Sequence, residues 1–328
     1  MTTAKASLFD IAPEDRARSR PPSPLGLARL SLEGLSIGDA FGERFFGSPA
    51  TVRSLIEQRA MPREPWHWTD DTAMALSIYE VLLDRGLIDR GALARRFGER
   101  YRADPRRGYG GAAHDILAKL ADGAPWNEVA REPFDGQGSM GNGGAMRSAV
   151  VGGFFSRDLD AVVDNARASA EPTHAHPDGH AGAIAVALAA ALAARRGDGE
   201  AFAAAQFFAQ IAERTPAGAT RDGIEQARRV SLSESPESAA ALLGSGSRVI
   251  SSDTVPFSLW CAARHMDDFE AALWSTVSGL GDRDTTCAIV GGIVALSVGY
   301  EGIPEAFSKA REPLDSKATH IERHAQRG

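Results

Sequence analysis

Two short runs of carboxylate and hydroxyl side chains lie far apart in the sequence, and each directly precedes an apolar stretch with helical periodicity. The first run is Thr69-Asp70-Asp71-Thr72, after Trp68, and the second is Asp282-Arg283-Asp284-Thr285, after Gly281. Neither run contains His or Cys, so both offer only the oxygen ligands that hard cations such as Mg²⁺ and Mn²⁺ prefer. If the runs meet in space, the fold must bring two distant helix starts together.

Each run also has a simpler interpretation. Asp and Thr are common N-cap residues, so either run alone could do no more than begin a helix. The two runs together favour metal ligation, because several carboxylates packed in a partly dry cavity repel one another and divalent cations relieve that repulsion. We therefore expect a centre with two Mg²⁺ or Mn²⁺ ions, which is compatible with capping.

The remaining pattern predicts an all-helical protein. Alanine-rich segments at Ala181–Ala194 and Ala201–Ile211 are helix formers of small volume, which allows helices to approach closely. Strand signals are scarce, and the best candidate, Ser247–Ser252, is short. We expect a compact orthogonal array of helices rather than an α/β layer structure, with helices near residues 90–101 and 112–121.

Length and composition favour one domain. The chain has 328 residues, of which 43% are hydrophobic, so it can bury a large core. The first 25 residues mix prolines with charges, and we expect residues 1–25 to form a flexible N-terminal arm without a secretory signal. The single domain should cover residues 26–312, with a loop over 125–144. Residues 313–328 should form a polar C-terminal tail that ends in a frayed or surface helix.

Glycine recurs at every fourth position in the first helical pattern, at Gly34, Gly38 and Gly42. Such a row lies along one face of a helix and lets a neighbour approach closely. Charged residues, among them Arg29 and Asp39, interrupt the apolar run, which argues against a membrane helix. We expect the close neighbour to be another helix or a ligand.

Charge and cysteine content narrow the class of protein. The formal net charge is -7 and the pI is about 5.7, which disfavours an extended nucleic-acid or membrane-binding surface. The longest near-apolar stretch, Ala181–Ala194, is shorter than the roughly 20 residues that a bilayer requires. Cys261 and Cys287 are too few for a disulfide framework and lie in apolar helical patterns, so they should be core residues in a reducing compartment. We expect a cytoplasmic monomer.

Two glycine-containing segments suggest a binding site. Gly138-Ser139-Met140-Gly141-Asn142-Gly143 runs into an apolar helical pattern, so its backbone N–H groups could hold a phosphate or diphosphate. The loop matches neither a Walker A loop nor a dinucleotide fingerprint, and an irregular connector is the alternative. Tyr109, between Gly108 and Gly110, offers a stacking wall for a purine base, although a glycine-tolerant helix start explains this segment almost as well.

A third segment contains two histidines one residue apart, in Thr173-His174-Ala175-His176-Pro177. This spacing suggests zinc, but no third ligand of matching type is nearby, and the oxygen-rich runs suit a harder metal. We expect His174 to contact the substrate and His176 to lie in the turn that begins a helix.

The order of these motifs resembles the ADP-ribosylglycohydrolases, which include dinitrogenase reductase-activating glycohydrolase and the ADP-ribosyl-arginine and ADP-ribosyl-serine hydrolases. Any one motif would be weak, whereas six in order are specific. The motifs, which span about Gly34 to Tyr300, are Gly34-Leu-Ser-Ile-Gly38-Asp39-Ala40-Phe-Gly42, Trp68-Thr69-Asp70-Asp71-Thr72, Gly138 to Arg147, Thr173-His174, Thr254-Val255-Pro256 and Gly281-Asp282-Arg-Asp284-Thr285. The resemblance implies an all-helical fold, a binuclear Mg²⁺ or Mn²⁺ site, and release of ADP-ribose from a modified acceptor.

The resemblance also implies roles for individual residues. The loop from Gly138 to Gly143 would hold the diphosphate and the distal ribose, and His174 would line the same pocket. The residues implied to hold the two ions are Thr69, Asp70, Asp71, Asp282, Asp284 and Thr285. Our hypothesis is that water attacks the anomeric carbon and that Asp70 or Asp71 accepts its proton, with Asp284 also required for turnover.

Two motifs depart from the pattern of many relatives. Leu280 and Arg283 replace a Gly and a Thr in the late motif. Phe46 stands where relatives commonly have a Glu that gates the active site, which leaves Glu33 and Glu43 as the nearest alternatives.

The acceptor is the remaining question. We expect the N-glycosidic link to arginine, because a more open site can admit a protein side chain, and the O-link to serine is the alternative. A non-catalytic ADP-ribose-binding module is a third possibility, against which the four intact aspartates of the two runs argue.

Overall fold

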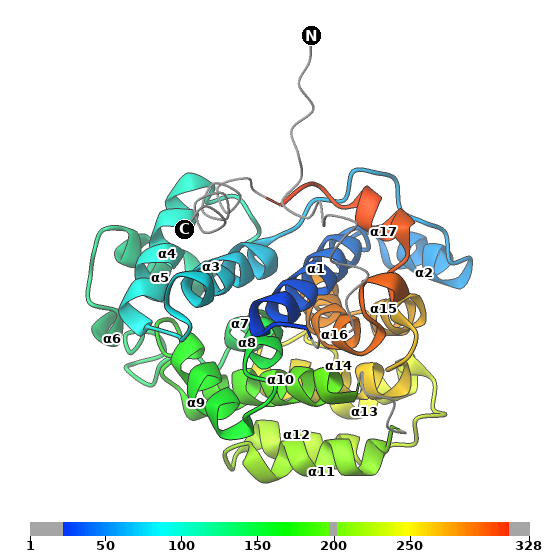
Figure 1. Cartoon of the computed structure of the whole chain (residues 1–328). Coiled ribbons are helices and arrows are strands. Elements are labelled where there is room, and N and C mark those ends of the chain that lie inside the picture. The colour runs from blue at the N-terminus through cyan, green and yellow to red at the C-terminus, as the bar shows by residue number, and fades with distance from the viewer. Residues whose placement is uncertain (1–21, 197–201, 315–328) are drawn as a thin grey trace.

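The computed structural model describes residues 22–196 and 202–314, which form helices joined by short connections (Figure 1). These residues contain no strand, and the nearest approach to one is a pair of isolated bridges, Trp66 with Arg311 and Gly141 with Ile250. The all-helical prediction is confirmed. In chain order the helices are α1 (Pro24–Glu43), α2 (Pro49–Glu57), α3 (Asp70–Arg85), α4 (Arg90–Ala103), α5 (Gly111–Ala121), α6 (Trp126–Val129), α7 (Gly143–Met146), α8 (Ala149–Phe154), α9 (Leu159–Ala170), α10 (Pro177–Arg196), α11 (Ala204–Arg214), α12 (Ala219–Ala227), α13 (Pro236–Leu243), α14 (Ser251–Arg264), α15 (Phe269–Ser278), α16 (Arg283–Val298), the 3-10 turn η2 (Tyr300–Gly302) and α17 (Glu305–Ala310).

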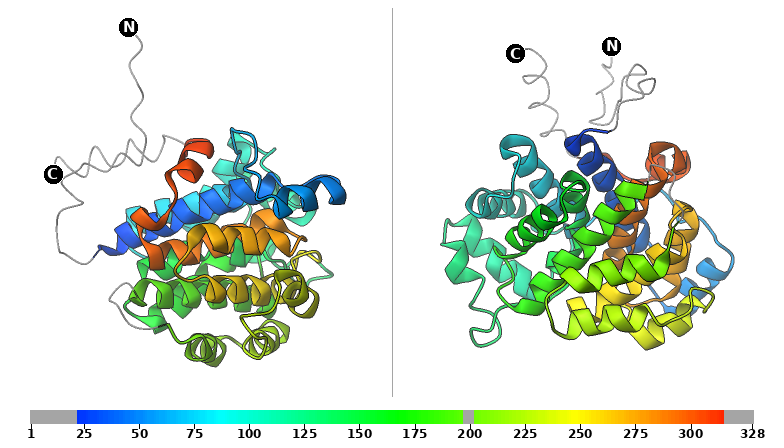
Figure 2. Two further views of the ribbon diagram at one scale, coloured as in Figure 1. Left: turned by 90° about the vertical axis from the view of Figure 1, so that its right-hand side faces the viewer. Right: turned by 60° about the horizontal axis from the view of Figure 1, so that its bottom comes forward.

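Helices α1 and α16 run antiparallel, side by side, through the middle of the molecule (Figures 1 and 2). The glycine row of α1 makes this contact possible. A Cβ built on Gly38 would lie 2.0 Å from the carbonyl oxygen of Cys287, and one on Gly42 would lie 2.2 Å from that of Arg283. The close neighbour of the glycine row is therefore a helix, which was one of the two neighbours expected, the other being a ligand. Because the end of α1 meets the start of α16, Asp39 comes close to the second acidic run.

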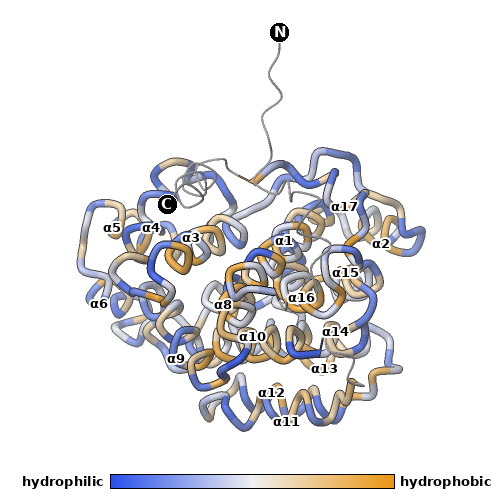
Figure 3. The backbone as a smooth tube through the Cα atoms, in the orientation of Figure 1, coloured by the Kyte–Doolittle hydropathy of each residue, from blue (hydrophilic) through white to orange (hydrophobic). Residues whose placement is uncertain are grey.

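The core surrounds this pair and continues into α10. Figure 3 shows the hydrophobic stretches gathered on the central helices, with more polar chain on the outer ones. Helix α10 is longer than the predicted apolar stretch and has the length and composition of a membrane span. However, 72% of its apolar stretch is buried inside the protein. It is therefore a core helix. Cys261 and Cys287 are both fully buried, as predicted.

The best strand candidate, Ser247–Ser252, is not a strand, in agreement with the all-helical prediction. Val249 has a φ of +56° and α14 begins at Ser251, which leaves Ile250 a single bridge to Gly141. Two sequence-based boundaries differ from the structure. The loop predicted over 125–144 contains the short helix α6. Helix α1 begins at Pro24 behind the N-cap Ser23, within the predicted arm. The rest of the arm and most of the tail lie outside the described residues.

Candidate active site

The two acidic runs occupy the first turns of α3 and α16, and α1 lies next to both helices. Asp70 and Asp71 begin α3, while Asp282 precedes α16 and Asp284 lies in its first turn. Helices α3 and α16 contact each other. Burial first, and then the charge of Asp39, raises the pKa values of Asp70 and Asp71, to which Asp282 and Asp284 also contribute. The predicted convergence of the two distant helix starts is present.

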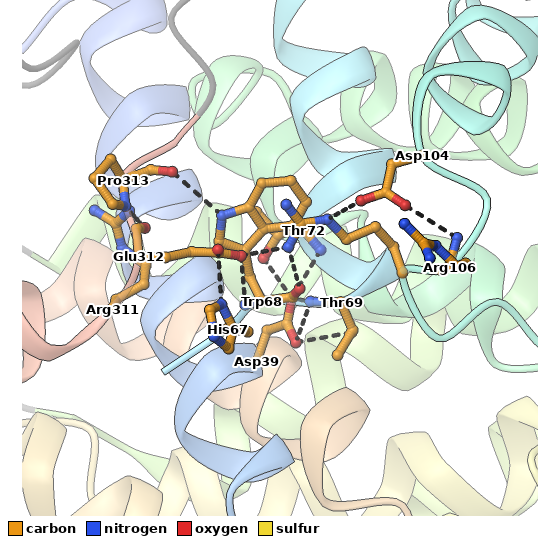
Figure 4. A network of polar contacts seen from close by, with 11 residues as sticks. Asp39, His67, Trp68, Thr69, Thr72, Asp104, Arg106, Arg311, Glu312 and Pro313 are labelled. Atoms are coloured by element: carbon orange, nitrogen blue, oxygen red, sulfur yellow. Dashed lines mark hydrogen bonds and ion pairs between the residues drawn. The ribbon is translucent and has the colours of Figure 1, made fainter. Parts of the chain in front are cut away.

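Asp39, on α1, is hydrogen-bonded to the turn that carries the first acidic run (Figure 4). Its side chain is fully buried, and its carboxylate accepts hydrogen bonds from the backbone N–H of Thr69 at 2.9 Å and of Thr72 at 3.0 Å. The hydroxyls of Thr69 and Thr72 donate to the same carboxylate at 2.8 Å and 2.5 Å. Asp39 therefore holds the turn that presents Asp70 and Asp71. The resemblance motif included Asp39, but no role was predicted for it.

Capping does not explain the acidic runs. Thr69 and Asp282 stand at the N-cap positions of α3 and α16, yet neither side chain makes a capping hydrogen bond. The Thr69 hydroxyl turns to Asp39, and the carboxylate of Asp282 accepts a hydrogen bond from Asn142 Nδ2 at 2.7 Å. These side chains are thus directed toward the acidic cluster rather than toward their own helices.

Burial and mutual repulsion shift the titration of the cluster. Burial raises the pKa of Asp39 to about 6, against the lowering effect of its hydrogen bonds from Thr72 and Thr69. Burial, with the charges of Asp39 and Asp282, raises the pKa of Asp70 to about 7. The pKa values of Asp71 and Asp284 lie well above the usual range, first because of burial and then because of neighbouring carboxylates. The cluster is a strong candidate for binding positive charge.

One buried atom fits a cation in particular. Asp71 is almost wholly buried, and its Oδ1 has no hydrogen-bond partner, whereas its Oδ2 accepts from the Thr69 hydroxyl at 3.0 Å. An unsatisfied carboxylate oxygen among oxygen donors suits a hard divalent ion. Within the described ranges, no group of three or more His, Cys, Asp or Glu side chains is placed so that it could hold a metal ion. The two-ion centre, including Thr285, therefore stays a prediction, which the residue types and the unpartnered Asp71 Oδ1 support.

The loop Gly138–Gly143 is held against the residues before and within α14. Ser251 N–H donates to the Met140 carbonyl at 3.0 Å, and the Ser251 hydroxyl donates to the Gly141 carbonyl at 3.0 Å. The Asn142 N–H donates to the Val249 carbonyl, and its side-chain amide contacts Thr254 as well as Asp282. Asn142 thus links the loop directly to the second acidic run, which the sequence did not reveal.

His174 lies beneath this loop. A Cβ added to Gly141 would lie 3.4 Å from its Nε2, and one added to Gly143 would lie 3.2 Å from its Cε1. Its Nδ1 lies 2.7 Å from the Thr173 hydroxyl, which in turn accepts a hydrogen bond from Arg147 at 2.8 Å. Burial, with the charge of Arg147, holds the pKa of His174 well below its usual range. The ring nitrogen on the other side, Nε2, faces the glycine loop.

Tyr109 lies close to the first run, since Asp70 is among the charges that raise its pKa and the neighbouring Gly108 faces Thr69 and Asp70. Its ring is buried and packs edge-on against Tyr101, with ring centroids 5.2 Å apart, and against His114. Its role as a stacking wall stays a prediction.

A second polar network fastens the segment before the first run (Figure 4). The guanidinium of Arg107 lies over the Trp68 ring, 3.5 Å from its centroid, and donates to the Trp68 carbonyl. Glu312, after α17, pairs with Arg107 and His67 and accepts from the Trp68 N–H at 3.2 Å. The segment after α17 thus holds residues 67–68, which lead into Thr69, in place.

The two glutamates considered as gating residues lie in different surroundings. Glu33 is buried and forms an ion pair with Arg311 at 2.9 Å, so it is part of the protein interior. Glu43 is half-buried, and burial together with Asp39 raises its pKa, so it belongs to the acidic cluster. Phe46, at the position of the missing Glu, is 46% exposed, and the guanidinium of Arg283 lies 5.0 Å from the centroid of its ring.

Comparisons with known proteins agree with this geometry. A sequence model of ADP-ribosylglycohydrolase matches residues 20–327. The chain belongs to the ADP-ribosylglycohydrolase family. Human ADP-ribosylhydrolase ARH3 is 31% identical over 329 residues, covering 87% of this chain and 88% of that protein. An uncharacterized protein of Archaeoglobus fulgidus is 29% identical, covering 89% and 95%.

A solved structure described as an ADP-ribosylglycohydrolase-related protein complex shares the fold. It superposes with a TM-score of 0.60 at 23% identity, covering 88% of this chain and 93% of that one. Membership of the ADP-ribosylglycohydrolase family, together with these relatives, supports a hydrolase that acts on ADP-ribosylated substrates and gives ADP-ribose as product.

Proposed function

We propose that this ADP-ribosylglycohydrolase is a metal-dependent enzyme that removes ADP-ribose from a modified protein side chain. The observation that carries the proposal is the meeting of the starts of α3 and α16 around Asp39, with the orphaned Asp71 Oδ1 inside. Two Mg²⁺ or Mn²⁺ ions would be held by Thr69, Asp70, Asp71, Asp282, Asp284 and Thr285. When bound, such ions neutralise the carboxylates and make water a better nucleophile.

The chain's own groups supply the rest of the chemistry. Cleavage at the anomeric carbon develops positive charge on the sugar, which the nearby carboxylates stabilise. Asp70 or Asp71 accepts the proton of the attacking water, as a carboxylate of the cluster that can also hydrogen-bond this water. The backbone N–H groups of the glycine loop offer donors for the diphosphate and the distal ribose, and His174 lines the same pocket.

The acceptor link belongs to the same proposal. The sequence favoured arginine, but Arg283, which lies between Asp282 and Asp284 in the sequence, adds a positive charge next to the acidic cluster, with its guanidinium over Phe46. This charge disfavours a cationic acceptor. We therefore place the O-link to serine first and the N-link to arginine second. Cytoplasmic location and a monomeric state complete the proposal.

The test compares serine-linked and arginine-linked ADP-ribosyl peptides in Mg²⁺, Mn²⁺ or a chelator, with free ADP-ribose as the readout. We expect metal-dependent release, faster from serine, and loss of most turnover together with weaker metal binding in Asp284→Ala. Binding of ADP-ribose without metal-dependent release would select the non-catalytic module. Near-normal hydrolysis by Asp284→Ala would contradict the assignment of the site.

A further inference from the structure

Arg147 carries a charge that the proposed chemistry does not use. It follows α7, directly after the glycine loop, and its side chain is fully buried, with the guanidinium 4.5 Å from the centroid of the Phe97 ring. Burial lowers the pKa of Arg147 to about 9, and the charge of Asp70 opposes this shift. A buried charge is costly unless hydrogen bonds satisfy it, so the acceptors of these bonds show which part of the fold Arg147 holds.

The hydrogen bonds of Arg147 lead to the turn after α9. Its Nη2 donates to the Ser169 carbonyl and to the Thr173 hydroxyl, both at 2.8 Å. The Thr173 oxygen lies 2.7 Å from His174 Nδ1, at hydrogen-bond distance. On the other side, Arg147 Nη1 donates to the sulfur of Met74, on α3, at 3.3 Å. One guanidinium therefore connects the turn that carries His174 with the helix that begins at the first acidic run.

The glycine loop rests on this turn. A Cβ added to Gly143 would lie 3.2 Å from His174 Cε1, and one added to Gly138 would lie 2.6 Å from the Cβ of Ala175. Behind the ring, a Cβ added to Gly179 would lie 3.2 Å from His174 Cδ2. Both ends of the loop thus contact residues 174–175 closely, and a different position of the His174 ring would change the shape of the loop.

We propose that Arg147 is a positioning residue for ADP-ribose binding, which fixes the His174 ring through the Thr173 hydroxyl and thereby the glycine loop. This inference rests on the proposed function, in which that loop holds the diphosphate and the distal ribose. Because Arg147 is fully buried, it acts through these residues and does not touch the substrate. A planar guanidinium can donate to two oxygens while its face lies against a ring, which the ammonium of lysine cannot do.

Two variants of the full chain test the proposal. Arg147→Lys keeps the charge and removes the planar donor, and Thr173→Val keeps the shape of the side chain and removes the hydroxyl. Calorimetric titration with ADP-ribose at saturating Mn²⁺ should show about tenfold weaker binding in each variant, as for one lost hydrogen bond to a charged group. Titration with Mn²⁺ alone should give the wild-type affinity. If Arg147→Lys does not fold, Thr173→Val alone decides.

The double variant shows whether the two residues act in one chain of contacts. It should bind ADP-ribose no more weakly than the weaker single variant, because either change already breaks the connection to His174. Losses that add in the double variant would overturn the proposal. Equal losses of ADP-ribose and Mn²⁺ affinity in the single variants would also overturn it, since they would show a general loss of structure.

Arg264→Lys is the matched control. Arg264 lies at the end of α14 that is remote from the glycine loop, and it too donates to two oxygens, the carbonyls of Leu232 and Glu234. Its guanidinium lies 5.2 Å from the centroid of the Trp260 ring. The change therefore removes a similar set of contacts and should keep the wild-type affinity for ADP-ribose. A tenfold loss in this control as well would remove the case for Arg147.

Hydrogen exchange followed by mass spectrometry tests the loop without a ligand. The amides of residues 138–144 should exchange about tenfold faster in Arg147→Lys and Thr173→Val than in the wild type, while those of α16 keep their rates. Unchanged exchange in the loop would overturn the proposal. If the wild type neither binds nor releases ADP-ribose, the proposed function fails, and the exchange rates still decide whether Arg147 positions the loop.

Discussion

Asp39 organises the site through the hydrogen bonds that its carboxylate accepts. Its single carboxylate receives two backbone N–H groups and two hydroxyls from Thr69 and Thr72. These bonds keep the turn in a shape that directs Asp71 into the cluster. Asp39 also raises the pKa values of Asp70, Asp71 and Asp284. One buried residue thus sets both the geometry and the electrostatics of the predicted metal centre.

Replacing Asp39 with Asn should weaken metal binding by about 10- to 100-fold, as expected for a group that orients metal ligands. The amide keeps the size of the side chain but offers only one oxygen to four donors. Isothermal titration with Mn²⁺ measures the loss. Asp89→Asn is the control, because Asp89 caps α4 by accepting from the Ala92 N–H. If both variants bind Mn²⁺ as the wild type does, Asp39 has no role in orienting the ligands.

Part of the site could be predicted at the level of residues, and part could not. The oxygen-rich runs, the glycine loop and His174 carry chemistry in their own composition, and the structure places them close together. The tie from Asn142 to Asp282 could not be predicted, because it depends on α14 holding the loop against the start of α16. The sequence does show an aspartate in the glycine row, at Gly38-Asp39. The role of Asp39 can be recognised only once the contact between α1 and α16 is known.

At the level of elements, the α1–α16 contact decides where the two runs meet. Glycines on both helices let the backbones approach, and the row on α1 predicted this approach correctly. The partner could not be identified from the sequence, since a row of small residues says how close a neighbour comes and not which one it is. The contacts of Glu312 could not be identified from the sequence either. Its carboxylate binds His67 and the Trp68 N–H, which lie far from it in the sequence.

Gly38→Ala should destabilise the protein by about 3 kcal/mol, the upper part of the range for overpacking a core. The added methyl would lie 2.0 Å from the Cys287 carbonyl oxygen, and the atom that must yield is backbone. Urea unfolding followed by circular dichroism measures the change. Gly111→Ala, in the first turn of α5 with no atom within 4 Å of the added Cβ, should be close to neutral. Equal stability of the two variants would show that α1 and α16 can separate without cost.

Glu312→Ala should lower metal affinity about tenfold, because the segment that leads into Thr69 loses its clamp. The change removes the partners of His67, Arg107 and the Trp68 N–H together. Mn²⁺ titration and the intrinsic fluorescence of the protein, to which Trp68 contributes, are the measurements. Glu305→Ala removes an exposed carboxylate from α17, where it pairs only with Lys309 within the same helix, and should change neither. A matching effect in both variants would argue against the clamp.

At the level of the whole molecule, the fold buries a set of carboxylates that repel one another, so stability and metal binding are linked through pH. Burial raises the pKa values of Asp39 and Asp70 in the folded protein to about 6 and about 7, above the ordinary value of 3.8 for an aspartate. Groups shifted in this direction contribute their stability fully below the unfolded pKa and lose it as the pH rises through the folded values. The metal-free protein should therefore lose this contribution between about pH 4 and pH 7.

The rise in Tm on adding Mg²⁺ or Mn²⁺ should be greater at pH 8 than at pH 5.5, by about 2–4 °C. Ions must displace protons at the lower pH, whereas at the higher pH they relieve a repulsion that is already present. Differential scanning fluorimetry with and without a chelator gives the two shifts. His174, whose pKa is lowered, destabilises the fold as the pH falls below its unfolded value, but it does so in both samples. Equal shifts at the two pH values would contradict this link.

Both cysteines of the chain are fully buried in the core. A maleimide dye should therefore leave the native protein unlabelled, and one cysteine introduced at an exposed position would be the single point of attachment. Phe46 is such a position, next to Arg283. A fluorophore there would report optically on changes next to the acidic cluster, such as metal binding, with no native thiol to remove first.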